Sequence, residues 1–222
     1  MAEHLTQSEE NYIKAIYYIY QRSNAPVGTN DLAERMETKA SSVTDMIKKL
    51  SEKSLITYKK YKGCELTSLG EKRALKLVRK HRLWETFLVE KLNFGWDEVH
   101  DIAEELEHIN SAKLTSKLDE YLDYPKFDPH GDPIPDSQGE IAKRESTVKL
   151  SELKLEQSAI VIGVSDSSPS FLRFLDRHKI NIGSSLKVIE IYEFDDSREI
   201  LFNDQKINLS SEASQKITVQ KG

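Results

Sequence analysis

The stretch TNDLAERMETKASSVTDMIKKLSEKSLITYKKYKGCELT, residues 29–67, decides the fold of the first third of the chain. Its first part predicts a short helix from Asn30 to Met36, with Thr29 as the N-cap residue. After a turn, a second helix is predicted from Ser41 to about Glu52, because apolar residues recur there at helical spacing. Two helices joined by a short turn are typical of a helix-turn-helix unit.

The second part of this stretch predicts a β-hairpin. Residues 55–59 alternate between apolar and polar side chains, residues 64–67 return as a second strand, and Lys62 and Gly63 form the turn. A hairpin directly after a helix-turn-helix gives a winged helix-turn-helix, whose second helix enters the DNA major groove. The alternative is that the unit serves only as a scaffold or as a protein-docking module.

Lysines and small hydroxyl residues fall on the two elements that would meet DNA, which favours DNA binding. Lysines neutralise phosphates, and hydroxyl groups bond to phosphates or base edges. The residues expected to contact DNA are Lys39 in the turn before the second helix, then Ser41, Ser42, Thr44, Asp45, Lys48 and Lys49 on that helix, and Lys60, Tyr61 and Lys62 at the hairpin tip.

A longer helix precedes this unit. Thr6 and Glu9 have the spacing of a capping box, so the helix is predicted to begin after Thr6 and to run to about Gln21. Its broad apolar face consists of Tyr12, Ile13, Ile16, Tyr17, Ile19 and Tyr20.

Charge is distributed unevenly along the chain. The net charge is −5, yet residues 39–62 carry seven lysines against two acids, and residues 96–140 carry thirteen acids against three lysines. A basic segment followed by an acidic one indicates a polyanion-binding element and a cation-binding element in one chain. Ordinary charge clustering is the alternative.

Composition limits the class of protein. The single cysteine, Cys64, excludes an internal disulfide and a cysteine-based zinc finger. No apolar run is long enough to cross a bilayer, and the N-terminus lacks the basic start and apolar core of a signal peptide. We therefore expect a cytoplasmic protein that does not bind membranes.

Two clusters of histidine and carboxylate residues lie in the acidic middle of the chain. His81 and Glu85 share a face of a helix predicted from Glu71 to about Leu92, after a linker at Ser68–Gly70. The second cluster, on a helix predicted from Trp96 to about Ile109, consists of His100, Glu104, Glu107 and His108. Imidazole and carboxylate without cysteine suit Mn(II), Fe(II), Zn(II), Co(II) or Ni(II). The alternative is a solvated acidic helix face.

The remaining chain predicts one further helix, a loop and a small β domain. The helix starts at Asn110 or Ser111 and ends near Leu122, and its apolar stripe is expected in the core or at a dimer interface. A proline-rich loop follows at 124–135, and then a polar linker at 136–147. Five short strands interrupted by a helix at 170–178 suggest a small β-barrel. They are predicted at residues 148–150, 159–164, 186–191, 199–202 and 216–219.

Three motifs together resemble the diphtheria-toxin-repressor family of iron- and manganese-dependent regulators. They are His81-Arg82-Leu83 with Glu85, then Val99-His100-Asp101 with Glu104, Glu107 and His108, then Pro129-His130-Gly131-Asp132-Pro133-Ile134-Pro135. The resemblance covers the whole chain and is looser towards the C-terminus, which is similar to the family's SH3-like, or FeoA-like, domain. It implies homodimers that bind a palindromic operator when metal is bound.

The resemblance also implies two metal sites. The primary site would use Asn11, Glu104, Glu107 and His108. The ancillary site would use His81, Glu85 and His100, together with Asp128 and His130 from the loop and Asp166 from the β domain. Glu104 follows the manganese-responsive pattern, whereas Asn11 follows neither metal's pattern. Lys14 replaces the acid that two-domain manganese regulators have, and Ser167 and Ser170, at barrel ligand positions, are poor ligands.

These observations predict a protein of mainly α structure with β elements. The predicted domains are a winged helix-turn-helix at 1–73, a dimerisation and metal domain at 74–140, a linker at 141–147 and an SH3-like domain at 148–222. The sequence lacks a phosphate-binding glycine loop, a Gly-x-Ser-x-Gly element and a convincing hydrolytic triad, so an enzyme is not expected.

The predicted function is a homodimeric, metal-dependent transcriptional repressor of metal-uptake genes that binds double-stranded DNA. Mn(II) is the expected metal, Fe(II) is second, and other divalent transition metals substitute for them. No small-molecule substrate is expected. The alternatives are a metal-independent winged-helix protein whose barrel binds a partner protein, and a metallohydrolase, for which the winged helix has no evident use.

Overall fold

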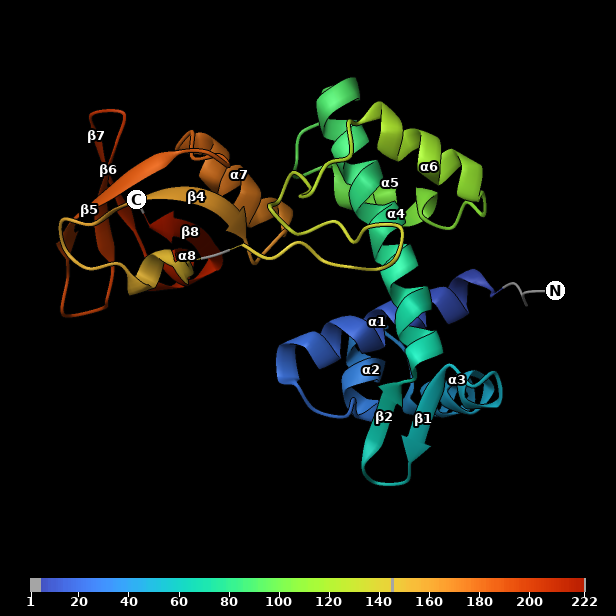
Figure 1. Ribbon diagram of the computed structural model, residues 1–222. Helices are drawn as coiled ribbons and strands as arrows, with labels where there is room; N and C mark the ends of the chain where they lie inside the picture. The colour runs from blue at the N-terminus through green and yellow to red at the C-terminus, as the bar shows by residue number, and fades with distance from the viewer. Residues whose placement is uncertain (1–4, 145, 222) are drawn as a thin grey trace. The chain divides into compact units, whose positions relative to one another are not determined.

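The computed structural model describes residues 5–144 and 146–221 (Figure 1). The predicted N-terminal start at residues 1–4, linker position 145 and the last position, 222, lie outside the described residues. The chain divides into two compact units. The first contains the residues up to His81 together with Glu105–Ser111 and Pro135–Glu140, and the second contains Arg82–Glu104, Ala112–Ile134 and the residues from Ile141 onward.

The N-terminal part of the first unit is a winged helix-turn-helix, as predicted. Its elements are α1 (Gln7–Ser23), α2 (Thr29–Arg35), α3 (Ala40–Glu52) and the antiparallel hairpin β1 (Ile56–Lys59) and β2 (Gly63–Leu66). The capping box of α1 is confirmed, because the Thr6 hydroxyl accepts from the Glu9 N–H and the Thr6 N–H donates to the Glu9 carboxylate. Capping satisfies N–H groups that the first turn leaves unpaired.

The start of α2 differs from the prediction. Thr29 is the first helical residue, and Gly28 is the N-cap in an extended conformation. The Gly28 N–H donates to the Asp31 side chain at 3.2 Å, so the acid three residues on supplies the capping interaction that a Thr29 hydroxyl was expected to give. Similarly, α3 begins at Ala40 with Lys39 as its N-cap, one residue earlier than predicted.

The hairpin is fixed to the helices through Val27. Val27 and Cys64 exchange two backbone hydrogen bonds of 2.8 and 2.9 Å, so Val27 extends the hairpin as a short third segment. Gly63 has a φ of 94°, and a Cβ there would lie 2.6 Å from the Val27 carbonyl oxygen. Glycine is therefore required where the wing meets this segment.

Helix α4 (Ser68–Leu92) begins three residues before the predicted start at Glu71. The Thr67 hydroxyl accepts from the Gly70 N–H and the Thr67 carbonyl accepts from the Glu71 N–H, so Thr67 caps a helix that includes Ser68 to Gly70. A glycine is required at position 70, because a Cβ there would collide with the Leu55 carbonyl oxygen. Sequence patterns gave no sign of this close approach.

The two following helices are shorter than predicted. Helix α5 (Val99–Leu106) was expected from Trp96 to Ile109, and α6 (Ala112–Tyr121) was expected to reach Leu122. Glu107 and His108 therefore lie in a turn that follows α5. Leu83 of α4, Leu118, Leu122 and Ile134 form a small buried cluster in the second unit.

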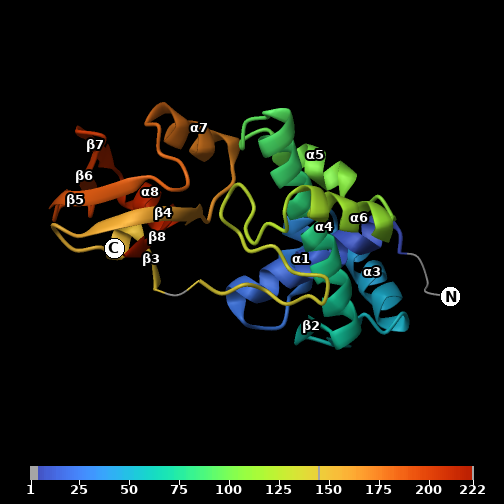
Figure 2. The same cartoon turned by 45° about the horizontal axis from the view of Figure 1, so that its top comes forward.

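The C-terminal domain is an antiparallel sheet of six strands in the order β3-β8-β4-β5-β6-β7 (Figures 1 and 2). The strands are β3 (Thr147–Lys149), β4 (Ser158–Val164), β5 (Ser185–Ile191), β6 (Arg198–Phe202), β7 (Gln205–Leu209) and β8 (Ile217–Lys221). A 3₁₀ turn η1 (Leu150–Glu152), α7 (Pro169–Arg177) and α8 (Ser211–Lys216) complete it. The hydrophobic core of this domain includes Val161 of β4, Leu172 of α7 and Val188 of β5, and Val148 of β3 packs against it.

Strand β7 and helix α8 were missed by the sequence analysis. Only Ile207 and Leu209 of β7 are buried, so the strand offers two apolar positions to a pattern search. It forms because the turn at Asn203 and Asp204, both with positive φ, folds it back on β6. Helix α8 is short, and its sequence offers only the N-cap residue Ser210 and the buried Ala213 as helix signals.

The proline-rich loop is anchored to the C-terminal sheet, and both belong to the second unit. The His130 carbonyl accepts from the Val164 N–H at 2.9 Å. Gly131 has a φ of 88°, and a Cβ there would collide with the Ile162 carbonyl oxygen. These backbone contacts fix the position of the loop at His130 and Gly131 against β4. In the described part of the chain no helix is long and apolar enough to span a membrane.

Candidate metal centre

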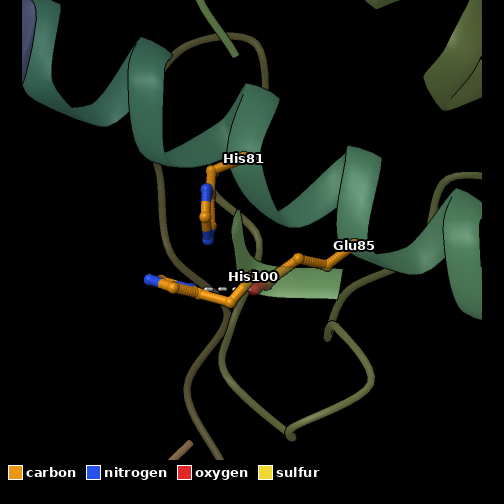
Figure 3. Close-up of side chains that lie close together, drawn as sticks. All are labelled: His81, Glu85 and His100. Atoms are coloured by element: carbon orange, nitrogen blue, oxygen red, sulfur yellow. Dashed lines mark hydrogen bonds and ion pairs between the residues drawn. The ribbon is translucent and has the colours of Figure 1, made fainter. Parts of the chain in front are cut away.

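Helix α4 carries the first predicted ligands. His81 and Glu85 lie on successive turns of this helix and so share one face, and both are buried (Figure 3). His100 of α5 meets Glu85, with its Nδ1 at 3.4 Å from a carboxylate oxygen. The structure thus places a histidine from α5 beside the α4 carboxylate.

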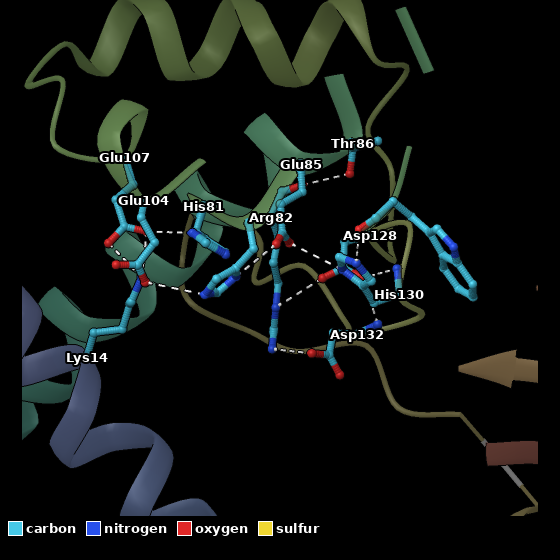
Figure 4. A network of polar contacts seen from close by, with 12 residues as sticks. Lys14, His81, Arg82, Glu85, Thr86, Glu104, Glu107, Asp128, His130 and Asp132 are labelled. Atoms are coloured by element: carbon cyan, nitrogen blue, oxygen red, sulfur yellow. Dashed lines mark hydrogen bonds and ion pairs between the residues drawn. The ribbon is translucent and has the colours of Figure 1, made fainter. Parts of the chain in front are cut away.

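The loop brings two further ligand types to Glu85. One potential ligand atom each from Glu85, Asp128 and His130 lie within 4.8 Å of one another, and all three residues are buried. His130 Nε2–H donates to the Trp96 carbonyl at 2.8 Å, and its Nδ1 lies 3.7 Å from Glu85 (Figure 4). A carbonyl that fixes one imidazole nitrogen leaves the other oriented for a metal ion.

Burial and neighbouring charges perturb this group. Burial, with the nearby Glu85 and Asp132 carboxylates, raises the pKa of Asp128 to about 7. Burial opposes a charged His130, but hydrogen bonding and attraction to Glu85, with Asp128 and the Trp96 carbonyl, raise its pKa to about 9. A carboxyl and an imidazole whose pKa values are both raised, in a buried cluster, are typical of a functional site.

Asp128 also builds the loop. Its Oδ1 accepts from the N–H groups of His130 and Asp132, each at 2.9 Å, and its Oδ2 lies 3.5 Å from Arg82. Arg82 in turn contacts Asp132 at 3.3 Å (Figure 4). Both Asp128 oxygens are therefore engaged by backbone N–H groups or lie near Arg82, which makes Asp128 less available to a metal ion.

A second polar cluster surrounds Glu107 in the first unit. Lys14 Nζ of α1 donates to both Glu107 oxygens at 2.7 Å, and His81 Nδ1 lies 2.7 Å from one of them (Figure 4). His108 Nδ1 bonds to Glu10 at 2.6 Å, and its Nε2 is 3.8 Å from Glu107. His81 thus lies with Glu107 as well as on the Glu85 face of α4.

The remaining predicted primary ligands are Asn11 on α1 and Glu104 on α5. Glu104 is three residues before Glu107 and contacts His100 at 3.8 Å. Asn11 follows Glu10 on α1, and its Oδ1 is buried without a hydrogen-bond partner among the described residues. A buried amide oxygen without a donor costs free energy, and a cation would satisfy it. The carboxylate, amide and imidazole groups suit a divalent metal of the Mn(II) or Fe(II) type.

Asp166 has a different environment. It lies 2.9 Å from Lys216 Nζ and accepts a hydrogen bond from the Ser168 N–H. Burial raises the pKa of this carboxyl, but Lys216 and Ser168 outweigh it, so the pKa is lowered. Within residues 5–144 and 146–221, Asp166 is in none of the groups of clustered metal-ligand side chains.

The predicted DNA-contacting residues are mostly exposed. On α3, Ser41, Ser42, Asp45, Lys48 and Lys49 are exposed, while Thr44 donates its hydroxyl to the Ala40 carbonyl. Lys39 is exposed at the α3 N-cap. At the wing tip, Lys60 and Lys62 are exposed, Tyr61 is 91% exposed, and the Lys60 ammonium lies 5.0 Å from the Tyr61 ring.

The sequence analysis missed three partners that shape the clusters. Glu10 holds His108, Arg82 holds the loop acids, and Lys14 holds Glu107, whereas the sequence marked Lys14 only as a departure from a pattern. Lys14 and Glu107 are 93 residues apart, so no local spacing relates them. The sequence position of Glu10, next to the predicted ligand Asn11, could have indicated that Glu10 lies near His108.

The fold and the clusters define a class, a winged-helix protein with a carboxylate and histidine metal centre, and comparisons with known proteins give the family. Residues 4–64 match the family described as iron dependent repressor, N-terminal DNA binding domain. Residues 67–136 match iron dependent repressor, metal binding and dimerisation domain, and residues 148–221 match the FeoA domain.

Similar individual proteins are also metal-dependent repressors or metal-transport proteins by their names. A solved structure titled manganese-dependent transcriptional repressor complex with manganese is 35% identical, covers 96% of this chain and all of its own, and has a TM-score of 0.85. The iron-dependent repressor IdeR of Mycobacterium leprae is 31% identical over 59% of this chain and 56% of that protein. A probable metal transport system membrane protein of Chlamydia trachomatis is 34% identical over 59% of this chain and 30% of that protein.

The chain thus spans about half or less of the length of these two curated relatives. It belongs to the diphtheria-toxin-repressor and IdeR family of metal-dependent transcriptional repressors, and it carries the FeoA-like C-terminal domain. The predicted resemblance and fold class are confirmed, and the family is one of repressors rather than enzymes.

Proposed function

We propose that this chain is a repressor that binds a palindromic operator as a homodimer when metal is bound, and that it controls genes for metal-ion uptake. The observation that carries the proposal is the meeting of buried Glu85, His130 and Asp128 in a chain that also has a winged helix. The matched dimerisation domain and the repressor titles of the relatives support it.

For the metal, we propose Mn(II) first and Fe(II) second. Glu104 and Glu107 supply hard carboxylate oxygens, and Asn11 supplies a buried amide oxygen. Cysteine, which favours softer metals, occurs only as Cys64, which is buried in the winged helix. The manganese-dependent repressor of similar fold is consistent with this order.

The proposed sites remain those predicted from the sequence. Asn11, Glu104, Glu107 and His108 form the primary set, with His81, Glu85 and His100 in the ancillary set. The loop adds His130 more readily than Asp128, whose oxygens are occupied by backbone N–H groups and Arg82. Asp166 is the weakest candidate because it is paired with Lys216.

Helix α1 offers the connection between metal and DNA. Its Glu10 and Lys14 hold His108 and Glu107, and its Glu9 lies 3.2 Å from Lys49 and 2.9 Å from Lys53 at the C-terminal end of α3. A bound metal ion would supply positive charge to the carboxylates and imidazoles. Because one helix carries both sets of contacts, a change at Glu107 and His108 is transmitted to the DNA-contacting helix.

For domains, we propose boundaries at 1–73, 74–140, 141–147 and 148–222. The DNA-contacting set is the exposed face of α3 with the wing tip at Lys60, Tyr61 and Lys62. In a dimer, two α3 helices would reach half-sites about one helical turn of DNA apart, or a multiple of it.

The test uses a duplex selected from random DNA in the presence of Mn(II). Fluorescence anisotropy then measures affinity for this duplex with Mn(II) and with chelator. We expect tighter binding with Mn(II) and a loss of this gain in Glu85→Gln, with Asp132→Asn as the matched control. Equal affinity in metal and in chelator contradicts the proposal and favours a metal-independent DNA-binding protein.

A further inference from the structure

Lys14 forms a buried ion pair inside the cluster of proposed primary ligands. Its Nζ lies 2.7 Å from both Glu107 oxygens, and the exposed fractions of the two side chains are 7% and 0%. Charge-assisted bonds of this length are strong, and burial removes the water that would compete with them. The pair joins α1 to the turn after α5 (Figure 4).

The ammonium occupies the part of Glu107 that a metal ion would need. Lys14 bridges the two oxygens, and His81 Nδ1 is bonded to one of them. His108 Nε2 faces the other oxygen at 3.8 Å. A divalent cation bound to Glu107 would lie within a few ångströms of the ammonium, where two positive charges repel strongly in a buried site.

We propose that Lys14 is an internal cation which a divalent metal ion must displace from Glu107, so that Lys14 sets the metal concentration at which the primary site fills. This inference rests on the proposed function, because it assumes that Glu107 is a metal ligand. Lysine suits the role because its flexible four-carbon stem lets the ammonium leave the carboxylate.

Displacement also gives metal binding a mechanical consequence. Lys14 joins α1 to Glu107, while Glu9 of the same helix forms ion pairs with Lys49 of α3 and with Lys53, the C-cap residue of α3. Releasing Lys14 removes one of the attachments of α1, so the helix that positions α3 changes its contacts when the site fills.

The first experiment measures Mn(II) affinity of the full chain by calorimetry, without DNA. Lys14→Gln keeps a hydrogen-bond donor but removes the charge, and Lys76→Gln changes an exposed lysine of α4 as the matched control. We expect Lys14→Gln to bind Mn(II) at the primary site about tenfold more tightly or better. The control should match the unchanged chain.

The outcomes separate the inference from the proposed function. If the unchanged chain binds Mn(II) and Lys14→Gln binds it equally or more weakly, the inference is overturned. If the unchanged chain binds no Mn(II), the proposed function fails first. Glu107→Gln must lose the primary binding event, since otherwise the affinity change belongs to another site.

A second measurement needs no variant and so avoids any folding defect. Acetylation of Lys14 by a lysine-selective reagent is followed by mass spectrometry on the unchanged chain, with exposed Lys76 as internal reference. Metal-free protein should label slowly at Lys14, which is 5% exposed, and Mn(II) should speed labelling severalfold. An unchanged or slower rate with Mn(II) overturns the inference.

Discussion

Among the proposed ligands, Glu107 is fully buried and is hydrogen-bonded to both Lys14 and His81. Removing one member of a buried ion pair leaves an uncompensated charge. We therefore propose two roles for Glu107, one in the stability of the protein without metal and one in metal binding, and variants must be chosen to separate them.

Truncation of Glu107 should destabilise the metal-free chain. Glu107→Ala strands the Lys14 ammonium, and we expect a loss of about 3–5 kcal/mol in the free energy of unfolding. The double variant Lys14→Met with Glu107→Leu removes both charges and should recover most of that loss. Urea denaturation in chelator measures the free energy of unfolding of the unchanged chain, of Glu107→Ala and of the double variant. A double variant at least as destabilised as Glu107→Ala would contradict the ion-pair account.

At Glu85 and His130 the expected effect is on metal affinity. Loss of either side chain should weaken Mn(II) binding at the ancillary site about tenfold or more, since even residues that only orient ligands cost about 10–100-fold. Calorimetry of Glu85→Gln and His130→Gln tests this, with Asp132→Asn as control because Asp132 is 55% exposed and bonded to Arg82. An effect of Asp132→Asn as large as the others would indicate a structural role for the loop acids.

At the scale of elements, α1 is fixed to α3 through Glu9. Burial raises the pKa of Glu9, but the Thr6 N–H, Lys53 and Lys49 outweigh it and lower the pKa to about 2. A carboxyl with a lowered pKa in the folded state stabilises the fold above its ordinary pKa. That contribution is lost as the pH falls from about 4.5 towards 2.

Glu9→Gln should therefore lower the free energy of unfolding by about 3 kcal/mol at neutral pH. The difference between the variant and the unchanged chain should shrink as the pH falls below 4.5 and nearly vanish near 2. Urea titrations across this pH range measure it. A difference that stays constant with pH would show that the loss comes from packing rather than from the ion pairs.

The exposed lysines of α3 and the wing should act on DNA through charge. Replacing Lys48 or Lys62 with alanine should lower affinity for every sequence and reduce the slope of log K against log salt by about 0.9 each. Within residues 5–144 and 146–221, the ion pair of Lys48 is with exposed Asp45 at 3.8 Å, so the Lys48 charge remains available to a phosphate. Anisotropy titrations over a salt series decide this, and an unaltered slope would remove the residue from the proposed interface.

At the scale of the whole molecule, the sequence predicted what local patterns carry. The winged helix, the capping box at Thr6 and the strands with strong apolar alternation were all predictable, because neighbours along the chain determine them. The end of α5 was not, since the stripe from His100 to His108 continues a helical pattern past Leu106. There Glu107 and His108 are held by α1 side chains more than 90 residues away.

The candidate site was predictable in residue types but not in connections. Spacing marked clusters of histidine and carboxylate, and the family resemblance assigned the proposed ligands among them. The Lys14–Glu107 pair, the Arg82 contact with Asp128 and the carbonyl of Trp96 that fixes His130 depend on tertiary structure, which no short motif encodes. These contacts connect the proposed ligands to α1 and to the loop.

In the proposed function metal binding and DNA binding are coupled, and thermodynamic linkage requires the coupling to be reciprocal. The most direct test measures Mn(II) affinity by calorimetry with and without a saturating selected duplex, beside the duplex affinity with and without Mn(II). The account predicts that each ligand tightens the other by the same factor, about 5–150-fold. Mn(II) affinity that is the same with and without DNA would contradict it.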